Sequence, residues 1–139
     1  ERVGYYGEQI VLLAQTLGLN TCWVKLTYKK VPGAFEIGPG ERLVIVIALG
    51  YGETQGVPHR NKPLDKLCSA PEDAPAWFRS GMEAVLLAPT AVNQQKFLFT
   101  LSGDSVKAQT PRGACTEIDL GIAKYHFEIG AGKDNFTWA

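Results

Sequence analysis

An unbroken apolar run, Leu43 to Leu49 (LVIVIAL), is the sequence feature that most constrains how this chain can fold. The run is rich in β-branched side chains and shows no alternation with polar residues. Such a strand is buried on both faces, as in the middle of a sheet. A segment rich in glycine, residues 50–58, follows the run and opens a polar loop. We therefore expect a central strand over residues 43–49.

Helical periodicity predicts a helix on each side of this run and one at the end of the chain. The first helix extends from about Gly4 to Leu17, and Gly18 is placed to end it in the left-handed conformation. The last helix ends near Gly130 and Gly132. The apolar stripes of these two helices are Tyr6, Ile10, Leu13, Ala14 and Leu17 in the first, and Ile118, Ile122, Tyr125 and Ile129 in the last.

The middle helix is predicted from its start signals and its apolar residues. Ser69–Glu72 has the spacing of a capping box, and Asp73 is a competing N-cap. Pro89 stops the helix. Its inward residues are expected to be Trp77, Phe78, Met82, Val85 and Leu86.

The remaining segments read as turns and short strands. We expect an irregular stretch from Asn20 to Lys30, a loop from Pro32 to Gly40, and a brief turn from Thr90 to Gln94. Strand-like residues flank a hairpin turn at Ser102–Ser105, and Asn135–Ala139 forms a final edge strand or an arm. The predicted strands on either side of that turn are 97–101 and 106–109. The elements together predict an α+β layer fold, with an antiparallel or mixed sheet flanked by helices, in one domain over residues 1–139.

Charge and cysteine content narrow the function classes. The chain of 139 residues has 14 basic and 14 acidic residues, and this balance argues against a dedicated nucleic-acid binder. Zero net charge also gives little repulsion against self-association. The three cysteines are widely spaced without a CxxC, which argues against a disulfide framework or a zinc site. No run approaches a membrane span and no leader is recognisable, so cytoplasm is the expected location.

No self-contained catalytic motif is present, and no metal site is expected. His59 lies in a loop, and His126 is interpreted as a helix-surface histidine or a satisfied core histidine. No other histidine is placed to complete a metal site with either of them.

Two segments have the composition of a ligand site. Gly18–Val24 follows a helix, and such a turn can place backbone groups against a flat ligand, or can simply be a helix end with a Trp anchor. In His59–Leu64, Arg60 and Lys62 lie on a loop stiffened by Pro63. This pair of cations can hold a phosphate or can be solvated surface charge.

A third segment, Ala88–Phe97, carries three consecutive side-chain amides, at Asn93, Gln94 and Gln95. Amides present donors and acceptors together, which suits the pyrimidine edge of a flavin or a nucleobase. A capped turn with exposed amides is the alternative.

These segments together resemble the FMN-dependent nitroreductase family. Ala88-Pro-Thr-Ala-Val-Asn-Gln-Gln-Lys-Phe97 is similar to that family's A-P-S-x-x-N-x-Q-P-W-x-F stretch, with Thr90 in place of Ser and Lys96 in place of Pro. Gly18-Leu-Asn-Thr-Cys-Trp23 is similar to its G-L-G-T-C-W segment. The apolar run with the Arg60–Leu64 loop resembles its late strand and its phosphate-contact loop.

The order of the motifs is reversed relative to ordinary members, in which A-P-S-x-x-N comes early. This order resembles the subgroup in which a nitroreductase-like unit is followed by a second, similar half, closed by Ile118–Ala123 and the helix after it. The chain begins at Glu1 without Met, and nothing matches the family's initial R-x-S-x-R segment. We therefore expect the C-terminal portion of a longer protein.

The resemblance implies the site residues. Arg60 and Lys62 would contact the FMN phosphate. Asn20, Thr21, Cys22 and Trp23 would form a backbone wall. Asn93 and Gln95 would contact the flavin edge.

The resemblance also implies two-electron ping-pong chemistry. NAD(P)H would reduce FMN, which would then reduce a nitroaromatic, quinone or enone, without a side-chain general acid. Two alternatives stay open: a structural half that packs against a true flavin half, and a flavin-binding module without turnover. A homodimer, or packing against a missing N-terminal half, would cover the apolar surface that such a portion exposes.

Overall fold

The computed structural model describes residues 1–139, which divide into two compact units. The first unit comprises residues 1–9 and 57–139, and the second comprises residues 10–56. The boundary between the units falls inside the first helix, α1 (Arg2–Thr16). None of the helices is both long enough and apolar enough to cross a bilayer.

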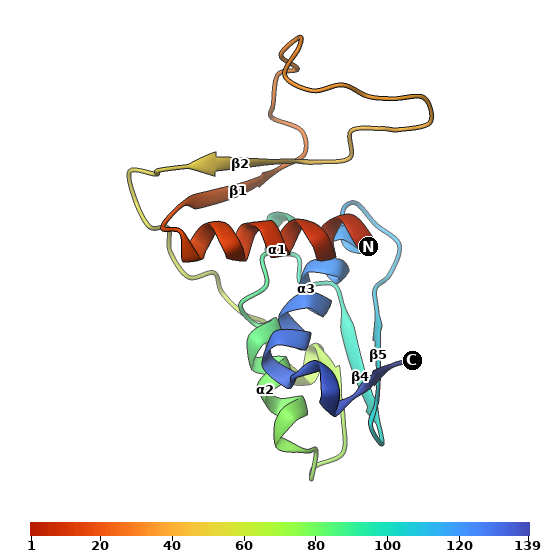
Figure 1. Ribbon diagram of the computed structural model, residues 1–139. Coiled ribbons are helices and arrows are strands. Elements are labelled where there is room, and N and C mark those ends of the chain that lie inside the picture. The colour runs from red at the N-terminus through yellow and green to blue at the C-terminus, as the bar shows by residue number, and fades with distance from the viewer. The chain divides into compact units, whose positions relative to one another are not determined.

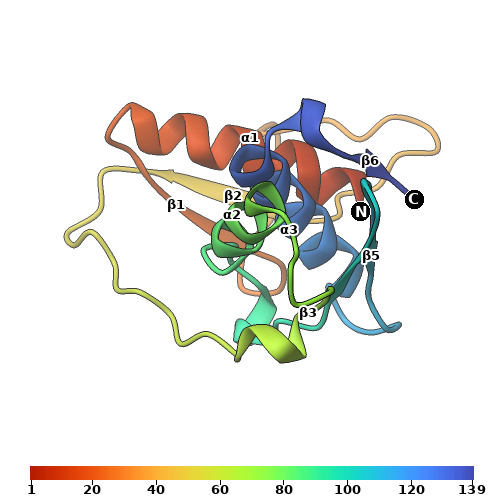
Figure 2. The same cartoon turned by 90° about the horizontal axis from the view of Figure 1, so that it is seen from below.

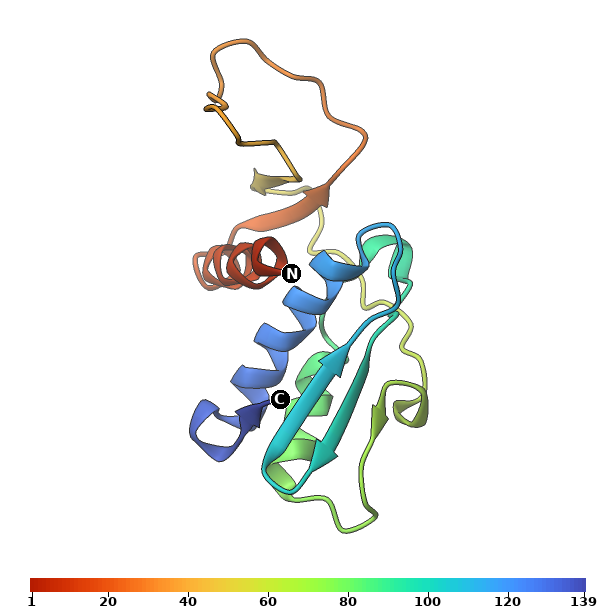
Figure 3. The ribbon, with the colours of Figure 1, turned by 90° about the vertical axis from the view of Figure 1, so that its right-hand side faces the viewer.

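The first unit is a four-stranded mixed sheet covered by two helices (Figure 3). Its strands stand in the order β3 (Cys68–Ser69), β4 (Leu98–Ser102), β5 (Ser105–Gln109) and β6 (Thr137–Trp138). β4 and β5 form the predicted hairpin, whereas β3 and β6 pair in parallel at the two edges. Of the two alternatives predicted for the C-terminus, an edge strand or an arm, the edge strand is confirmed as β6.

Helices α2 (Ala76–Val85) and α3 (Thr116–Ala131) pack against each other in this unit (Figure 2). Two glycines let them approach closely: a Cβ at Gly81 would lie 2.6 Å from the Phe127 ring, and a Cβ at Gly130 would meet the Ser80 carbonyl group. α3 ends at Gly132, whose φ of 77° lies in the region that glycine favours. The predicted end of the last helix is therefore confirmed.

The core of the first unit is an aromatic cluster around Phe127, which is fully buried. Its ring stacks on Phe99 of β4 with centroids 5.2 Å apart, and it meets Phe78 of α2 edge-on at 5.6 Å. Phe136 approaches the same ring at 5.1 Å. Each buried aromatic side chain contributes roughly 1.5–3 kcal/mol by leaving water, so this cluster fixes the helices on the sheet.

The start of α1 packs closely against α3 at Gly4, and two buried carboxylates, Glu8 and Glu128, bind the two helices to each other. Gly4 faces the Ile118 carbonyl group with no room for a side chain. The Glu8 carboxylate lies 2.9 Å from the His126 ring nitrogen, and both side chains are buried. His126 is therefore a satisfied core histidine, one of its two predicted interpretations.

The second carboxylate, Glu128, binds the two ends of the chain together. It is buried and accepts hydrogen bonds from the Tyr5 hydroxyl, from Trp138 Nε1 at 2.9 Å, and from Lys133 Nζ at 2.9 Å. Burial alone would raise the pKa of Glu128, but these three donors and the charge of Lys133 outweigh it and hold the pKa below its ordinary value.

The second unit contains the rest of α1 and a two-stranded antiparallel ribbon, β1 (Asn20–Val24) and β2 (Val46–Gly50) (Figure 1). Residues 25–45 join the strands without helix or strand. Gly18 ends α1 with a φ of 74°, as predicted. Only Val11 and Ala14 are buried between residues 10 and 56, so this unit has almost no core of its own.

Three predictions about local structure are wrong. Asn20–Lys30 is not irregular, because Asn20–Val24 pairs with β2. The run at 43–49 is not a central strand: pairing begins at Val46, and the strand is half-exposed in a ribbon of two. Neither Ser69 nor Asp73 caps α2, because Ser69 lies in β3 and the N-cap is Pro75, whose fixed φ suits a helix start.

Candidate functional site

The turn after α2 has an unusual backbone. Within residues 90–95, φ is positive at Val92 (48°), Asn93 (54°) and Gln95 (42°). Residues with a β-carbon rarely adopt this conformation, which costs on the order of 1–3 kcal/mol each, and a β-branched valine disfavours it most. Such a turn persists only when surrounding bonds hold it, and here these bonds come from the basic loop on one side and from Asp119 of α3 on the other.

Gln95 and Asn93 hold the basic loop through its backbone. The buried Gln95 side chain accepts a hydrogen bond from the backbone N–H of Lys62 at 2.9 Å and donates to the Arg60 carbonyl at 2.8 Å. The Asn93 amide also donates to the Arg60 carbonyl at 2.8 Å, and its oxygen accepts from Gln95 at 2.7 Å. The structure therefore brings Arg60, Lys62, Asn93 and Gln95 into one hydrogen-bonded cluster.

Asp119, in the first turn of α3, holds the other side of this turn. Its carboxylate accepts hydrogen bonds from the backbone N–H of Ala91 at 3.0 Å and from the Gln94 amide at 2.6 Å. Burial raises the pKa of Asp119, although the two donated hydrogen bonds partly oppose that shift. Sequence reasoning missed this residue, because only the fold brings α3 next to the turn.

Lys62 connects the cluster to a cavity of about 490 Å³. Its ammonium group donates to the carbonyl oxygens of Gln94 at 2.7 Å and Gln95 at 3.2 Å. We call this space the lysine cavity, and its lining residues are Lys62, Lys66, Gln95, Lys96, Phe97, Leu98, Gln109, Thr110 and Pro111. Arg60 is exposed and does not line it.

The lysine cavity is positively charged. Three ammonium groups line it, at Lys62, Lys66 and Lys96, and no carboxylate does. The Asp65 carboxylate lies 3.7 Å from the Lys66 ammonium, but both groups are exposed and such pairs interact weakly. The cavity therefore suits an anion, and the amide of Gln95 and the hydroxyl of Thr110 add polar groups beside the charges.

The other predicted site residues lie in the second unit, on β1. Asn20 accepts a hydrogen bond from the backbone N–H of Gly52 at 2.9 Å and donates to the Thr54 carbonyl at 3.4 Å, so it fastens the end of the ribbon. Thr21 and Trp23 are half-buried, and the Cys22 thiol is exposed. The structure groups these four residues on one strand of the second unit, whereas Arg60, Lys62, Asn93 and Gln95 belong to the first unit.

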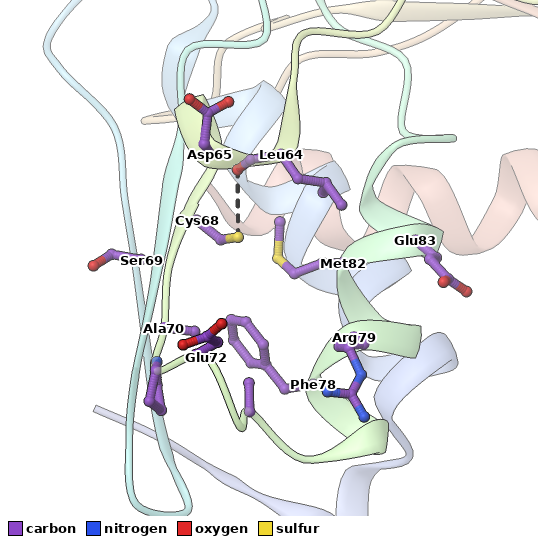
Figure 4. A pocket seen from close by; sticks show the side chains of 12 residues that line it. Leu64, Asp65, Cys68, Ser69, Ala70, Glu72, Phe78, Arg79, Met82 and Glu83 are labelled. Carbon is purple, nitrogen blue, oxygen red and sulfur yellow. Dashed lines mark hydrogen bonds between the residues drawn. The ribbon is translucent and has the colours of Figure 1, made fainter.

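A second cavity of the first unit, of about 510 Å³, was not predicted (Figure 4). The Phe78 ring and the sulfur atoms of Cys68 and Met82 face this space, and Asp65, Glu72 and Glu83 are among its charged lining residues. Burial, and then the charge of Asp65, raise the pKa of the Cys68 thiol. The thiol also donates to the Leu64 carbonyl at 3.3 Å, so it is a neutral group and not an activated nucleophile.

Comparison with known proteins places the chain in a family. A family model described as "Putative TM nitroreductase" matches residues 1–131. A solved structure from Thermotoga maritima, titled as a putative nitroreductase, matches with a TM-score of 0.72 and 26% identity. No curated protein matches the chain.

The match to the Thermotoga maritima protein covers 94% of this chain and 54% of that one, so the chain spans about half the length of the solved relative. The similarity confirms the predicted α+β, nitroreductase-like fold. Because the family model extends over nearly all of the sequence, the chain belongs to the family described as "Putative TM nitroreductase".

Proposed function

We propose that this chain is the phosphate-binding portion of an FMN-dependent oxidoreductase of nitroreductase type. The enzyme would oxidise NAD(P)H and reduce a nitroaromatic, quinone or enone. Family membership supports the reaction class, and nitroreductases generally use a flavin. The chain spans about half of its solved relative, so the proposal concerns what this portion adds to the complete active site.

The lysine cavity is the observation that carries the proposal. A phosphate monoester has a charge of roughly −1.5 to −2 near neutral pH and three acceptor oxygens. Lys62, Lys66 and Lys96 supply three ammonium groups around one cavity without a carboxylate among its lining residues. The residues therefore fit the phosphate of FMN, and Lys62 is the residue that the sequence resemblance assigns to this contact.

Each lysine has a distinct part in this proposal. Lys62 is already oriented, because its ammonium group binds the Gln94 and Gln95 carbonyls, and it keeps one of its three donors for an anion. Lys96 follows the turn directly, and Lys66 lies in the 3-10 turn Leu64–Lys66. Arg60 would contact the phosphate from the rim, since it is exposed beside Lys62.

The side-chain amides of Asn93 and Gln95 hold the backbone of the basic loop that carries Arg60 and Lys62. Gln95 uses its oxygen on Lys62 and its amide group on Arg60 and Asn93. These bonds favour a positioning role for Asn93 and Gln95, which would act on the ligand through the basic loop and not on the flavin edge.

FMN, when bound, supplies the two-electron hydride chemistry. We propose that the backbone of Asn20, Thr21, Cys22 and Trp23 forms a wall for its ring system. An extended strand suits this role, and β1 is extended. The Asn20 side chain also fixes the end of β1 to Gly52 and Thr54.

The test is FMN-dependent oxidation of NAD(P)H by the longer parent protein, with a nitroaromatic acceptor and without oxygen. Lys96→Ala should raise the FMN concentration needed for half-maximal rate by about tenfold, as expected for one charge-assisted contact. Lys107→Ala is the matched control, because Lys107 is an exposed lysine of β5 outside the lysine cavity.

The two alternatives give different results in this test. A protein that binds FMN but does not oxidise NAD(P)H would be a binding module. A parent that turns over normally with Lys62 and Lys96 both replaced by Ala would show that this portion is structural, and that the phosphate lies elsewhere.

A further inference from the structure

The cavity of about 510 Å³ in the first unit is lined by the segment around β3 and by helix α2 (Figure 4). We call it the acidic cavity. Its volume lies within the range of roughly 300–1,000 Å³ that is usual for pockets holding small molecules. All of its lining residues fall between positions 64 and 83, so the space belongs wholly to the first unit.

The floor of the acidic cavity is apolar. Phe78 and Met82 are 2% and 1% exposed, and they lie four residues apart on one face of α2. The Phe78 ring and the Met82 sulfur face the cavity, as does the sulfur of Cys68 (Figure 4). The Cys68 thiol keeps its proton near neutral pH, because burial raises its pKa. The floor therefore carries no charge and suits the apolar body of a ligand.

The rim of the acidic cavity is mainly negative. It carries the carboxylates of Asp65, Glu72 and Glu83 against one cation, Arg79. Arg79 and Glu83 lie four residues apart on α2, so their charges offset each other on the helix surface. The Asp65 carboxylate has the Lys66 ammonium at 3.7 Å, which is a weak, exposed pair. Glu72 has neither an ion pair nor a side-chain hydrogen bond, so its charge is free to meet a ligand.

We propose that the acidic cavity binds a small organic cation, an ammonium group on an aryl or alkyl body. The apolar body would pack on Phe78 and Met82, and the ammonium group would lie toward the Glu72 carboxylate. An aromatic ring attracts a cation through its face, and a thioether packs well against aromatic groups. An anionic ligand is disfavoured, because carboxylates outnumber the single guanidinium group on the rim.

The two cavities of the first unit differ in sign although they lie next to the same turn. In the 3-10 turn Leu64–Lys66, Lys66 lines the lysine cavity, whereas Leu64 and Asp65 line the acidic cavity. The cavities share no lining residue. The chain as a whole has no net charge, so any selection between cations and anions at these sites is local. A cation in the acidic cavity would therefore not compete with a phosphate in the lysine cavity.

The test uses the floor of the cavity as its own reporter. Met82 is the only methionine in the sequence, so a carbon-13 label on its methyl group gives one NMR signal from that floor. The probes are phenethylamine, phenethyl alcohol and hydrocinnamate, which share an aryl body and differ in charge. Phenethylamine should shift the signal in a saturable way and bind about tenfold more tightly than the neutral alcohol. Hydrocinnamate should bind more weakly than the alcohol.

A charge-removing variant then locates the ammonium group. Glu72→Gln should weaken phenethylamine about fivefold and leave the alcohol unchanged. Glu117→Gln is the matched control, because Glu117 is an exposed carboxylate of α3 outside the cavity. A Met82 signal that no probe shifts would overturn the proposal, and so would equal affinities for the amine and the alcohol. An amine affinity that Glu72→Gln leaves unchanged would also overturn it. None of these results bears on FMN binding at the lysine cavity.

Discussion

The side-chain oxygen of Gln95 accepts a hydrogen bond from the backbone N–H of Lys62 at 2.9 Å, across 33 positions of sequence. This bond joins the two segments that the sequence marked separately, the amide-rich turn and the basic loop. Because the bond holds the backbone of Lys62, the position of the Lys62 ammonium group at the lysine cavity depends on the buried amide of Gln95. The candidate phosphate site and the stability of the turn are therefore linked.

Gln95→Ala should destabilise the first unit by about 1–3 kcal/mol, because the Lys62 N–H loses its acceptor and the Arg60 carbonyl loses one of its two donors. Urea denaturation followed by circular dichroism measures this. Gln109→Ala, at an exposed position of β5, is the control and should change the free energy of unfolding by less than about 0.5 kcal/mol. Equal effects of the two substitutions would contradict the role given to Gln95.

Asp119→Ala should cost a similar amount, about 1–3 kcal/mol, because the Ala91 N–H loses its acceptor and the Gln94 amide loses one of its two acceptors. The comparison is Glu117→Ala, two positions earlier in the same helix turn and exposed. If the two variants have the same midpoint of denaturation, Asp119 does not hold the turn.

Glu128→Gln should give a stability difference from wild type that depends on pH. The folded pKa of Glu128 lies below its ordinary value, so the unfolded chain binds the proton more readily. The contribution of the charged group is therefore complete above about pH 5 and is lost as the pH falls through the folded pKa.

Near neutral pH the Glu128→Gln variant should be less stable by about 2 kcal/mol, and the difference should shrink toward pH 3. Urea denaturation of both proteins at several pH values gives this difference directly. The opposite slope expected from the raised pKa of Asp119 is common to both proteins and cancels. A difference that is constant with pH would rule out a charged Glu128 as the group that joins the two ends.

Gly121→Ala tests the crossing of α1 and α3. A Cβ at this position would collide with backbone atoms of Glu1 and Tyr5, which cannot rotate away. We expect a loss of roughly 1–3 kcal/mol and a lower melting temperature. Gly50→Ala is the control, because a Cβ there would meet nothing within 4 Å. A fully stable Gly121→Ala protein would mean that α1 does not cross α3 at this point.

Local signals in the sequence were sufficient for several elements. The limits of α1 and α3 follow from apolar periodicity and from Gly18 and Gly132, whose backbone conformations need glycine. The β4–β5 hairpin follows from its turn residues, with Gly103 at a φ of 59°. These features depend on residues close together in the chain, which is why pattern reasoning finds them.

The errors arise where burial depends on distant residues. The run at 43–49 has the composition of a central strand, yet β2 has a single neighbour, since composition does not determine how many strands pair. Apolar periodicity located α1, but it did not show that most of the predicted stripe is exposed and that only Ala14 of it is buried. Glu8 and His126 are 118 positions apart, and nothing local marks their contact. In the same way, Arg60, Lys62, Asn93 and Gln95 were identified as residues, but the bonds among them came only from the fold.

The most direct test of the phosphate site compares FMN with riboflavin, which lacks the phosphate, in titrations followed by flavin fluorescence. The account predicts that FMN binds more tightly than riboflavin, and that Lys62→Ala and Lys96→Ala each weaken FMN about tenfold while leaving riboflavin unchanged. Lys107→Ala should change neither. Equal affinities for FMN and riboflavin, unaffected by the lysine substitutions, would contradict a phosphate site at the lysine cavity.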